Sequence, residues 1–121
     1  MRVLPDKLTT EQIDGRSIVR DEAGYLVDPN DWDENIAHHI AMEEGITLSE
    51  EHWAVLRFMR DFLEQKGVAA DARFVFRHLG DIDGGGASAG RTRFFRLFPY
   101  GYVKQACKIA GMRQPRAWST G

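Results

Sequence analysis

The clearest pattern of apolar and polar positions lies between Ser49 and Gly67. Apolar side chains recur there every three or four positions, the spacing that places them on one face of an α-helix. Ser49 is typical of a helix N-cap, and Gly67 favours a left-handed helix end. The pattern predicts an amphipathic helix between these two residues. Its apolar positions are Trp53, Leu56, Met59 (or Phe58), Phe62 and Leu63.

Two weaker patterns predict helices on either side of this segment. After a turn at residues 28–31, a helical stripe ends at Gly45. Another helix is expected from 72 to about 79, with Asp71 as its N-cap and with Phe74, Val75 and Leu79 facing the core.

The C-terminal third of the chain starts with glycine. Residues 80–90 read GDIDGGGASAG and predict a flexible loop. A helix is then expected around residues 94–98, broken at 99–101, followed by a last helix over about 102–110 that stops at Gly111.

The N-terminal region favours short strands. Residues 1–14 show no clear periodicity and are expected to form a loosely held arm. Two β-prone runs, 16–20 and 25–27, flank a turn that contains Gly24, which predicts a β-hairpin.

These elements predict a mostly α fold of the α+β class. We expect a small bundle of about five helices with an N-terminal β-hairpin, forming one domain over residues 15–112, and a mobile C-terminal arm over 113–121. No apolar run approaches the ~20 residues of a membrane span. The first residues lack the apolar core of a signal peptide, so we expect a cytoplasmic protein.

Charge is distributed unevenly along the chain. The net charge is −2, but residues 91–121 carry 7 cations and no acid, whereas residues 1–90 carry 9 cations and 18 acids. Such a segment favours an anionic partner, which could be an acidic protein surface, a nucleic acid or an anionic cofactor.

Aromatic residues are interleaved with these cations, so the basic segment is expected to be folded and to present its charges to a partner. A solvated face without a partner remains an alternative. So does a DNA-binding helix-turn-helix formed by the last two helices, although the acidic chain and the scarcity of base-reading side chains on the last helix disfavour it. The partner-facing cations are Arg91, Arg93, Arg96, Lys104 and Lys108.

Other motifs are weak. The stretch GGASAGRT has Arg91 where a phosphate-binding loop has lysine, and no strand precedes it. Asp81 begins a run that resembles a calcium loop but lacks its closing glutamate. His39 and Glu43 are spaced i, i+4, yet nothing in the sequence completes a metal site, so a solvated helix face is expected. We expect no cofactor and no metal.

Cys107 is the only cysteine, so the chain cannot form an internal disulfide. Lys104 and Lys108 are its neighbours on the predicted last helix and would favour a reactive thiolate. Alternatively, Cys107 is a small buried residue beside Ala106 and Ala110.

Several extended stretches, in order, resemble one family. They are Glu44-Gly45-Ile46, Leu48-Ser49, Glu51-His52-Trp53, Val55 with Arg57-Phe58, Arg60-Asp61-Phe62, Arg96-Leu97-Phe98-Pro99 with Gly101, and Lys104-Gln105-Ala106-Cys107-Lys108-Ile109-Ala110-Gly111. Over about residues 15–115 the chain is similar to the TusE/DsrC family, which includes the sulfur-relay protein of tRNA 2-thiolation and the gamma subunit of dissimilatory sulfite reductase.

The resemblance implies a helical fold with an N-terminal hairpin and a mobile C-terminal arm whose penultimate cysteine carries sulfur into a partner protein. Cys107 matches the second cysteine of the dissimilatory members. The position of the terminal cysteine falls at Trp118, and the residues after it contain no thiol.

We therefore expect a protein that docks on a sulfite reductase or a sulfur-relay partner through its basic C-terminal face, with Trp118 as an aromatic anchor, and that lacks full sulfur-carrier activity. Two alternatives remain open: Cys107 alone accepts sulfur, or the last two helices bind DNA.

Overall fold

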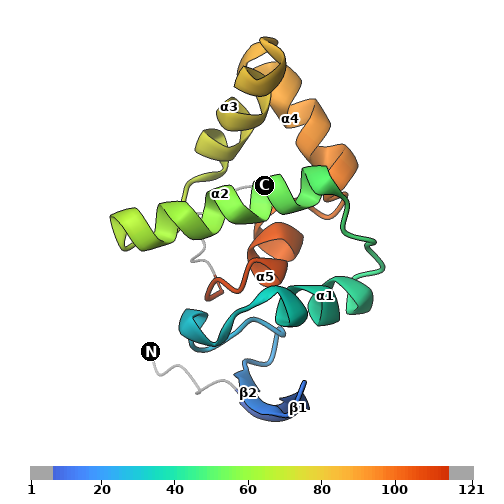
Figure 1. Cartoon of the computed structure of the whole chain (residues 1–121), viewed down its shortest axis with the longest axis vertical. Coiled ribbons are helices and arrows are strands. Elements are labelled where there is room, and N and C mark those ends of the chain that lie inside the picture. Colours follow the sequence, from blue (N-terminus) through green and yellow to red (C-terminus); the bar gives the residue numbers. More distant parts are fainter. Residues whose placement is uncertain (1–6, 115–121) are drawn as a thin grey trace, which may run out of the picture.

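The computed structural model describes residues 7–114 as a stack of helices above a two-stranded hairpin (Figure 1). The elements are β1 (Thr9–Ile13), β2 (Arg16–Arg20), η1 (Pro29–Asp31), α1 (Glu34–Glu43), α2 (Glu50–Lys66), α3 (Ala72–Asp83), α4 (Gly86–Leu97), η2 (Tyr102–Ala106) and α5 (Cys107–Ile109). The expected mostly α fold, with five α-helices and an antiparallel hairpin near the N-terminus, is confirmed.

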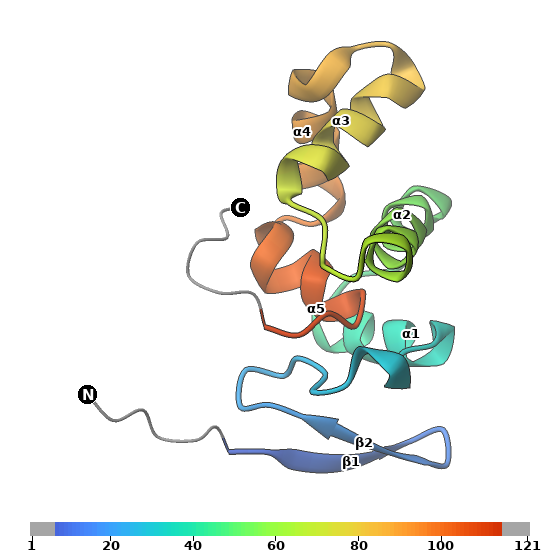
Figure 2. The same cartoon turned by 90° about the vertical axis from the view of Figure 1, so that its left-hand side faces the viewer.

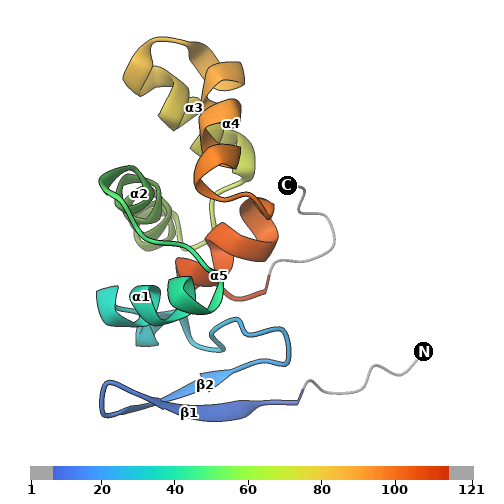
Figure 3. The ribbon, with the colours of Figure 1, turned by 90° about the vertical axis from the view of Figure 1, so that its right-hand side faces the viewer.

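The last helical segment occupies the middle of the stack. Figure 1 shows the hairpin at one end and the paired α3 and α4 at the other, with α5 between α1 and α2. Figures 2 and 3 show the same order from the two sides. The core side chains of this middle layer include Phe98, Tyr102 and Ile109, which are at most 1% exposed.

Helix ends follow the capping residues read from the sequence. The Ser49 side chain accepts from the His52 backbone and caps α2, while Gly67 ends that helix at φ 76°. Asp71 caps α3 through the Arg73 amide. Gly45 adopts φ 73° after α1, a conformation that glycine adopts without steric cost.

His52 connects the start of α2 to the end of α4. Its Nδ1 accepts from the Ser49 amide at 3.0 Å, so the ring proton is on Nε2, which donates to the Leu97 carbonyl at 2.8 Å. The ring also meets Phe98 edge-on at 5.1 Å. This buried imidazole fixes the point where the chain leaves α4 and turns towards η2.

The hairpin uses other strands than expected. β1 pairs with β2 in the register Thr9 to Arg20 and Ile13 to Arg16. Its turn is Asp14-Gly15, with φ values of 54° and 76°, and Asp-Gly is a strong signal for a two-residue hairpin turn. Residues 25–27 contribute only an isolated bridge from Leu26 to Arg20. Residues 9–13, expected within a loose arm, are therefore part of the folded protein.

The glycine-rich stretch is not a flexible loop. α3 continues to Asp83 and α4 begins at Gly86, so the two helices form a tight antiparallel pair. A Cβ atom on Gly90 would lie 1.8 Å from the Phe76 carbonyl oxygen. The glycines therefore allow the two backbones to approach each other, and this packing overrides their low helix propensity.

Phe74 does not face the core, contrary to its expected position. It is 46% exposed and stacks on Phe62 of α2, with the ring centroids 5.5 Å apart. Within the described residues, no helix combines the length and apolar character needed to cross a membrane.

Candidate functional site

A π-helical turn, η2, starts the segment that carries the candidate residues. Gly101 precedes it at φ 96° and ψ −178°, a conformation essentially restricted to glycine. The Gln105 side chain, 1% exposed, accepts from the Tyr100 amide at 3.1 Å and closes the turn. The Tyr25 hydroxyl donates to the Val103 carbonyl at 2.7 Å. The turn is thus held from both the helical and the N-terminal parts of the chain.

Cys107 is fully buried beneath this turn. Burial raises the pKa of its thiol to about 12, although an interaction with the Tyr102 hydroxyl acts in the opposite direction. Neither lysine reverses this effect, because the Lys104 side chain is exposed and Lys108 binds Glu44. Of the two readings of Cys107, the structure matches the small buried residue. Its role as a sulfur acceptor stays a prediction.

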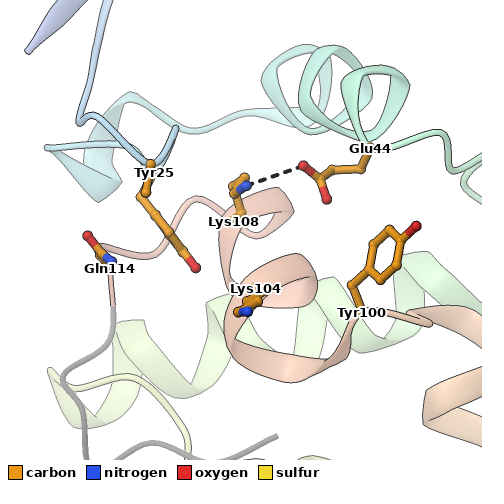
Figure 4. Close-up of a pocket in the computed structure, with 7 residues that line it drawn as sticks. Tyr25, Glu44, Tyr100, Lys104, Lys108 and Gln114 are labelled. Atoms are coloured by element: carbon orange, nitrogen blue, oxygen red, sulfur yellow. Dashed lines mark hydrogen bonds and ion pairs between the residues drawn. The ribbon is translucent and has the colours of Figure 1, made fainter.

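Lys104 and Lys108 border a surface pocket of about 360 Å³ (Figure 4). The Lys108 ammonium lies 3.2 Å from Glu44 Oε2 and 5.4 Å from the centre of the Tyr25 ring. The pocket is lined by Ala23, Tyr25, Glu44, Tyr100, Lys104, Lys108 and Gln114.

The other walls of this pocket could not be found from local sequence patterns. The pocket residues Tyr25, Glu44 and Tyr100 come from segments far apart in the sequence, and no motif links them. Tyr100 is 70% exposed at the rim. Burial raises the pKa of the Tyr25 hydroxyl to about 12, so this side chain remains a neutral hydrogen-bond donor at neutral pH.

The three arginines of the predicted partner face are on α4 and do not line the pocket. Arg91 is exposed, with its guanidinium 5.6 Å from the centre of the Phe95 ring. Arg93 is partly buried and lies 3.0 Å from Glu51 Oε2. Arg96 is exposed near the end of the helix. The expected basic face is therefore divided between α4 and the pocket, and Trp118 lies outside the described residues.

A clamp that sequence reasoning missed holds the end of α5. Trp32 Nε1 donates to the Ile109 carbonyl at 2.8 Å. The Arg60 guanidinium donates to the Ala110 carbonyl at 3.1 Å and lies 4.7 Å from the centre of the Trp32 ring. Burial lowers the pKa of Arg60. Together Trp32 and Arg60 fix the place where the chain leaves the helical stack.

The first residues after this clamp are also held. Met112 is 2% exposed, and Arg113 donates to the Val27 carbonyl at 3.2 Å. The C-terminal arm was expected to begin at Arg113. Most of it, residues 115–121, lies outside the described residues, so its mobility stays a prediction.

The last helical segment has little surface available for reading DNA. Most of its side chains are buried, and Lys104 is the exposed one within η2 and α5. A recognition helix needs several exposed side chains directed at base edges. This arrangement gives no support to the DNA-binding alternative.

Comparison with known proteins identifies relatives along nearly the whole chain. The family model described as "DsrC like protein" matches residues 12–117. The "Sulfurtransferase TusE" of Sodalis glossinidius is 42% identical over 105 residues, covering 86% of this chain and 95% of the relative. That of Escherichia coli strain K12 is 41% identical over 103 residues, covering 84% and 93%.

Solved structures show the same fold. The NMR structure of Allochromatium vinosum DsrC has a TM-score of 0.77 and 34% identity, covering 92% of this chain and 98% of that one. The crystal structure of the oxidized gamma subunit of the dissimilatory sulfite reductase from Archaeoglobus fulgidus has a TM-score of 0.76 and 30% identity, covering 90% and 98%. With this fold, and with matched residues that reach from β1 past the end of α5, the chain belongs to the DsrC-like family of sulfur-relay proteins.

Proposed function

We propose that this protein binds a sulfite reductase or a sulfur-relay protein through the surface around Lys104, Tyr100 and Arg96, without itself carrying sulfur. Lys104 supports this most directly, because its exposed ammonium group lies at the rim of a pocket and next to an aromatic ring that is 70% exposed. Exposed aromatic and cationic side chains beside a concave surface are typical of protein-binding sites.

The proposal that this protein does not carry sulfur rests on the chemistry of Trp118 and Cys107. In a sulfur relay, a thiolate attacks the outer sulfur of a donor persulfide and the donor leaves as a thiolate. The indole of Trp118 cannot do this. The Cys107 thiol is buried and protonated at neutral pH because burial raises its pKa to about 12. We therefore expect the chain to act in sulfur metabolism through its binding surface alone.

A binding measurement tests the surface. Lys104→Glu and Arg96→Glu together should weaken binding to a purified sulfite reductase or sulfur-relay partner by at least about tenfold, because reversing charges at a complementary interface costs several kcal/mol. Biolayer interferometry at two salt concentrations measures this loss. Arg73→Glu is the matched control, since Arg73 is an arginine on α3 whose side chain is 84% exposed.

The docking proposal fails if the double variant binds as tightly as the unaltered protein. It also fails if Arg73→Glu weakens binding equally, because the effect would then reflect total charge rather than this surface.

A second measurement tests sulfur acceptance. The native protein, incubated with a persulfide donor at pH 8 and then with iodoacetamide, should keep its original mass, because Cys107 is buried with a pKa of about 12. Intact-mass spectrometry follows the reaction. The same protein unfolded in urea should be alkylated at Cys107, and Trp118→Cys should gain one sulfur atom, which shows that the donor is competent. Rapid labelling of native Cys107 would contradict the proposal.

A further inference from the structure

A group of metal-ligating side chains lies at the other end of the molecule, between the hairpin and α1. His39 Nε2 is 3.1 Å from Glu11 Oε2 and 3.3 Å from Glu43 Oε2. One ligand atom from each of the three residues lies within 4.8 Å of the others. Their side chains are 35% to 40% exposed, so an ion from solvent can reach them.

The fold assembles this group from two elements. His39 and Glu43 are one turn apart on α1, which places them on the same face. Glu11 is on β1, opposite Ile18 in the hairpin register, and Ile18 is fully buried. Glu11 therefore lies on the side of the hairpin that packs against α1. The helix spacing alone supplies two ligands, and the hairpin adds the third.

Arg20 holds the two carboxylates in place. This side chain, 8% exposed, lies 3.0 Å from Glu11 Oε1 and 2.7 Å from Glu43 Oε1. It also donates to Glu43 Oε2 at 3.0 Å. Such outer partners commonly orient metal ligands.

Two of the three separations between ligand atoms match those around a small tetrahedral ion. Zinc bonds to imidazole nitrogen and carboxylate oxygen are about 2.0–2.2 Å long, which separates neighbouring ligand atoms by about 3.3 Å in a tetrahedron. The two measured separations from His39 Nε2 are 3.1 and 3.3 Å. The two carboxylates and the Arg20 guanidinium together carry a net negative charge that a dication would offset.

We propose that Glu11, His39 and Glu43 form a binding site for a divalent transition metal ion of the zinc class, with a fourth position open to solvent. The bound ion occupies the space between the imidazole nitrogen and the two carboxylate oxygens, in place of their direct contacts. Because its ligands come from β1 and α1, the ion joins the hairpin to the helical stack. It stabilises the folded chain by an amount that grows with the logarithm of the free ion concentration above the dissociation constant.

Titration of the full chain without a polyhistidine tag tests this site. Zn²⁺ should bind with a stoichiometry of one in isothermal titration calorimetry and should raise the unfolding temperature. Co²⁺ should give the strong visible absorption of a tetrahedral complex. His39→Ala should weaken Zn²⁺ binding by at least about tenfold, because it removes a direct ligand of the ion.

The neighbouring histidine supplies the control. His38 is exposed and contacts Trp53 edge-on at 5.1 Å, outside the group. His38→Ala should therefore retain the affinity and the cobalt spectrum. Absence of binding in the unaltered chain, equal affinity in His39→Ala, or equal loss in His38→Ala would each overturn the proposal. A circular dichroism spectrum of His39→Ala that matches the unaltered protein excludes unfolding as the cause of a loss.

Discussion

Gly90→Ala should destabilise the protein by about 3 kcal/mol or more, because the new methyl group meets backbone rather than a movable side chain. Its Cβ would lie 1.8 Å from the Phe76 carbonyl oxygen and 2.6 Å from the Gly80 amide nitrogen. Relief requires α3 and α4 to separate along their whole contact. Urea unfolding followed by circular dichroism measures the change in the free energy of unfolding.

Gly84→Ala is the matched control within the same helical pair. Gly84 adopts φ 72° and has no neighbouring atom within 4 Å of an added Cβ. It should cost only about 1 kcal/mol, the penalty of a left-handed conformation for a residue with a side chain. If Gly90→Ala lowers the free energy of unfolding no more than Gly84→Ala does, then α3 and α4 do not approach each other as closely at Gly90 as the structure shows.

Gly90→Ala should also affect the binding of a partner protein. Arg91, Arg93 and Arg96 follow Gly90 on α4, and His52 holds the carbonyl of Leu97 at the end of that helix. A displaced α4 would change the position of Arg96 relative to the pocket that Tyr100 and Lys104 line. Partner binding should therefore weaken in Gly90→Ala at temperatures where the variant remains folded.

Gly111→Ala should destabilise the protein by about 2–4 kcal/mol, the sum of a left-handed backbone penalty and an overpacked contact. Gly111 has φ 75°, and an added Cβ would lie 2.3 Å from Trp32 Cδ1. The indole cannot move freely, since its nitrogen donates to Ile109 and Arg60 covers its face.

Gly45→Ala separates the two contributions. Gly45 has φ 73° with no atom within 4 Å of an added Cβ, so only the backbone penalty applies there, about 1 kcal/mol. Unfolding of both variants in urea gives the difference. Equal effects at the two glycines would show that the Trp32 contact does not restrict the end of α5.

Locally encoded features were predictable because neighbouring residues alone determine them. The spacing of apolar residues in α2 identifies its buried face. Ser49 and Gly67 cap the two ends of this helix, where backbone groups lack partners within the helix. An N-terminal hairpin was predicted correctly, but its strands are 9–13 and 16–20 instead of 16–20 and 25–27. The Asp14-Gly15 turn carried the decisive local signal, whereas Gly24 adopts φ 95° in a turn that does not start a full strand pair.

Other features depended on residues far apart in the sequence. Periodicity predicted that Phe74 and Val75 both face the core. Val75 is buried, whereas Phe74 is half exposed and stacks on Phe62 of α2. The composition of residues 80–90 favours a loop when read alone. Only the facing helix explains why glycine is needed at position 90.

The sequence by itself determined the helical fold, both ends of α2, the family resemblance and the lack of any cysteine after Cys107, because spacing, capping and motif order are properties of neighbouring residues. The tertiary structure decided the environment of each candidate side chain. It buried Cys107, paired Lys108 with Glu44 and brought Glu11 to His39. Burial and charge pairing are set by segments distant in sequence, and these determine whether a thiol ionises, a lysine is available or an ion can bind.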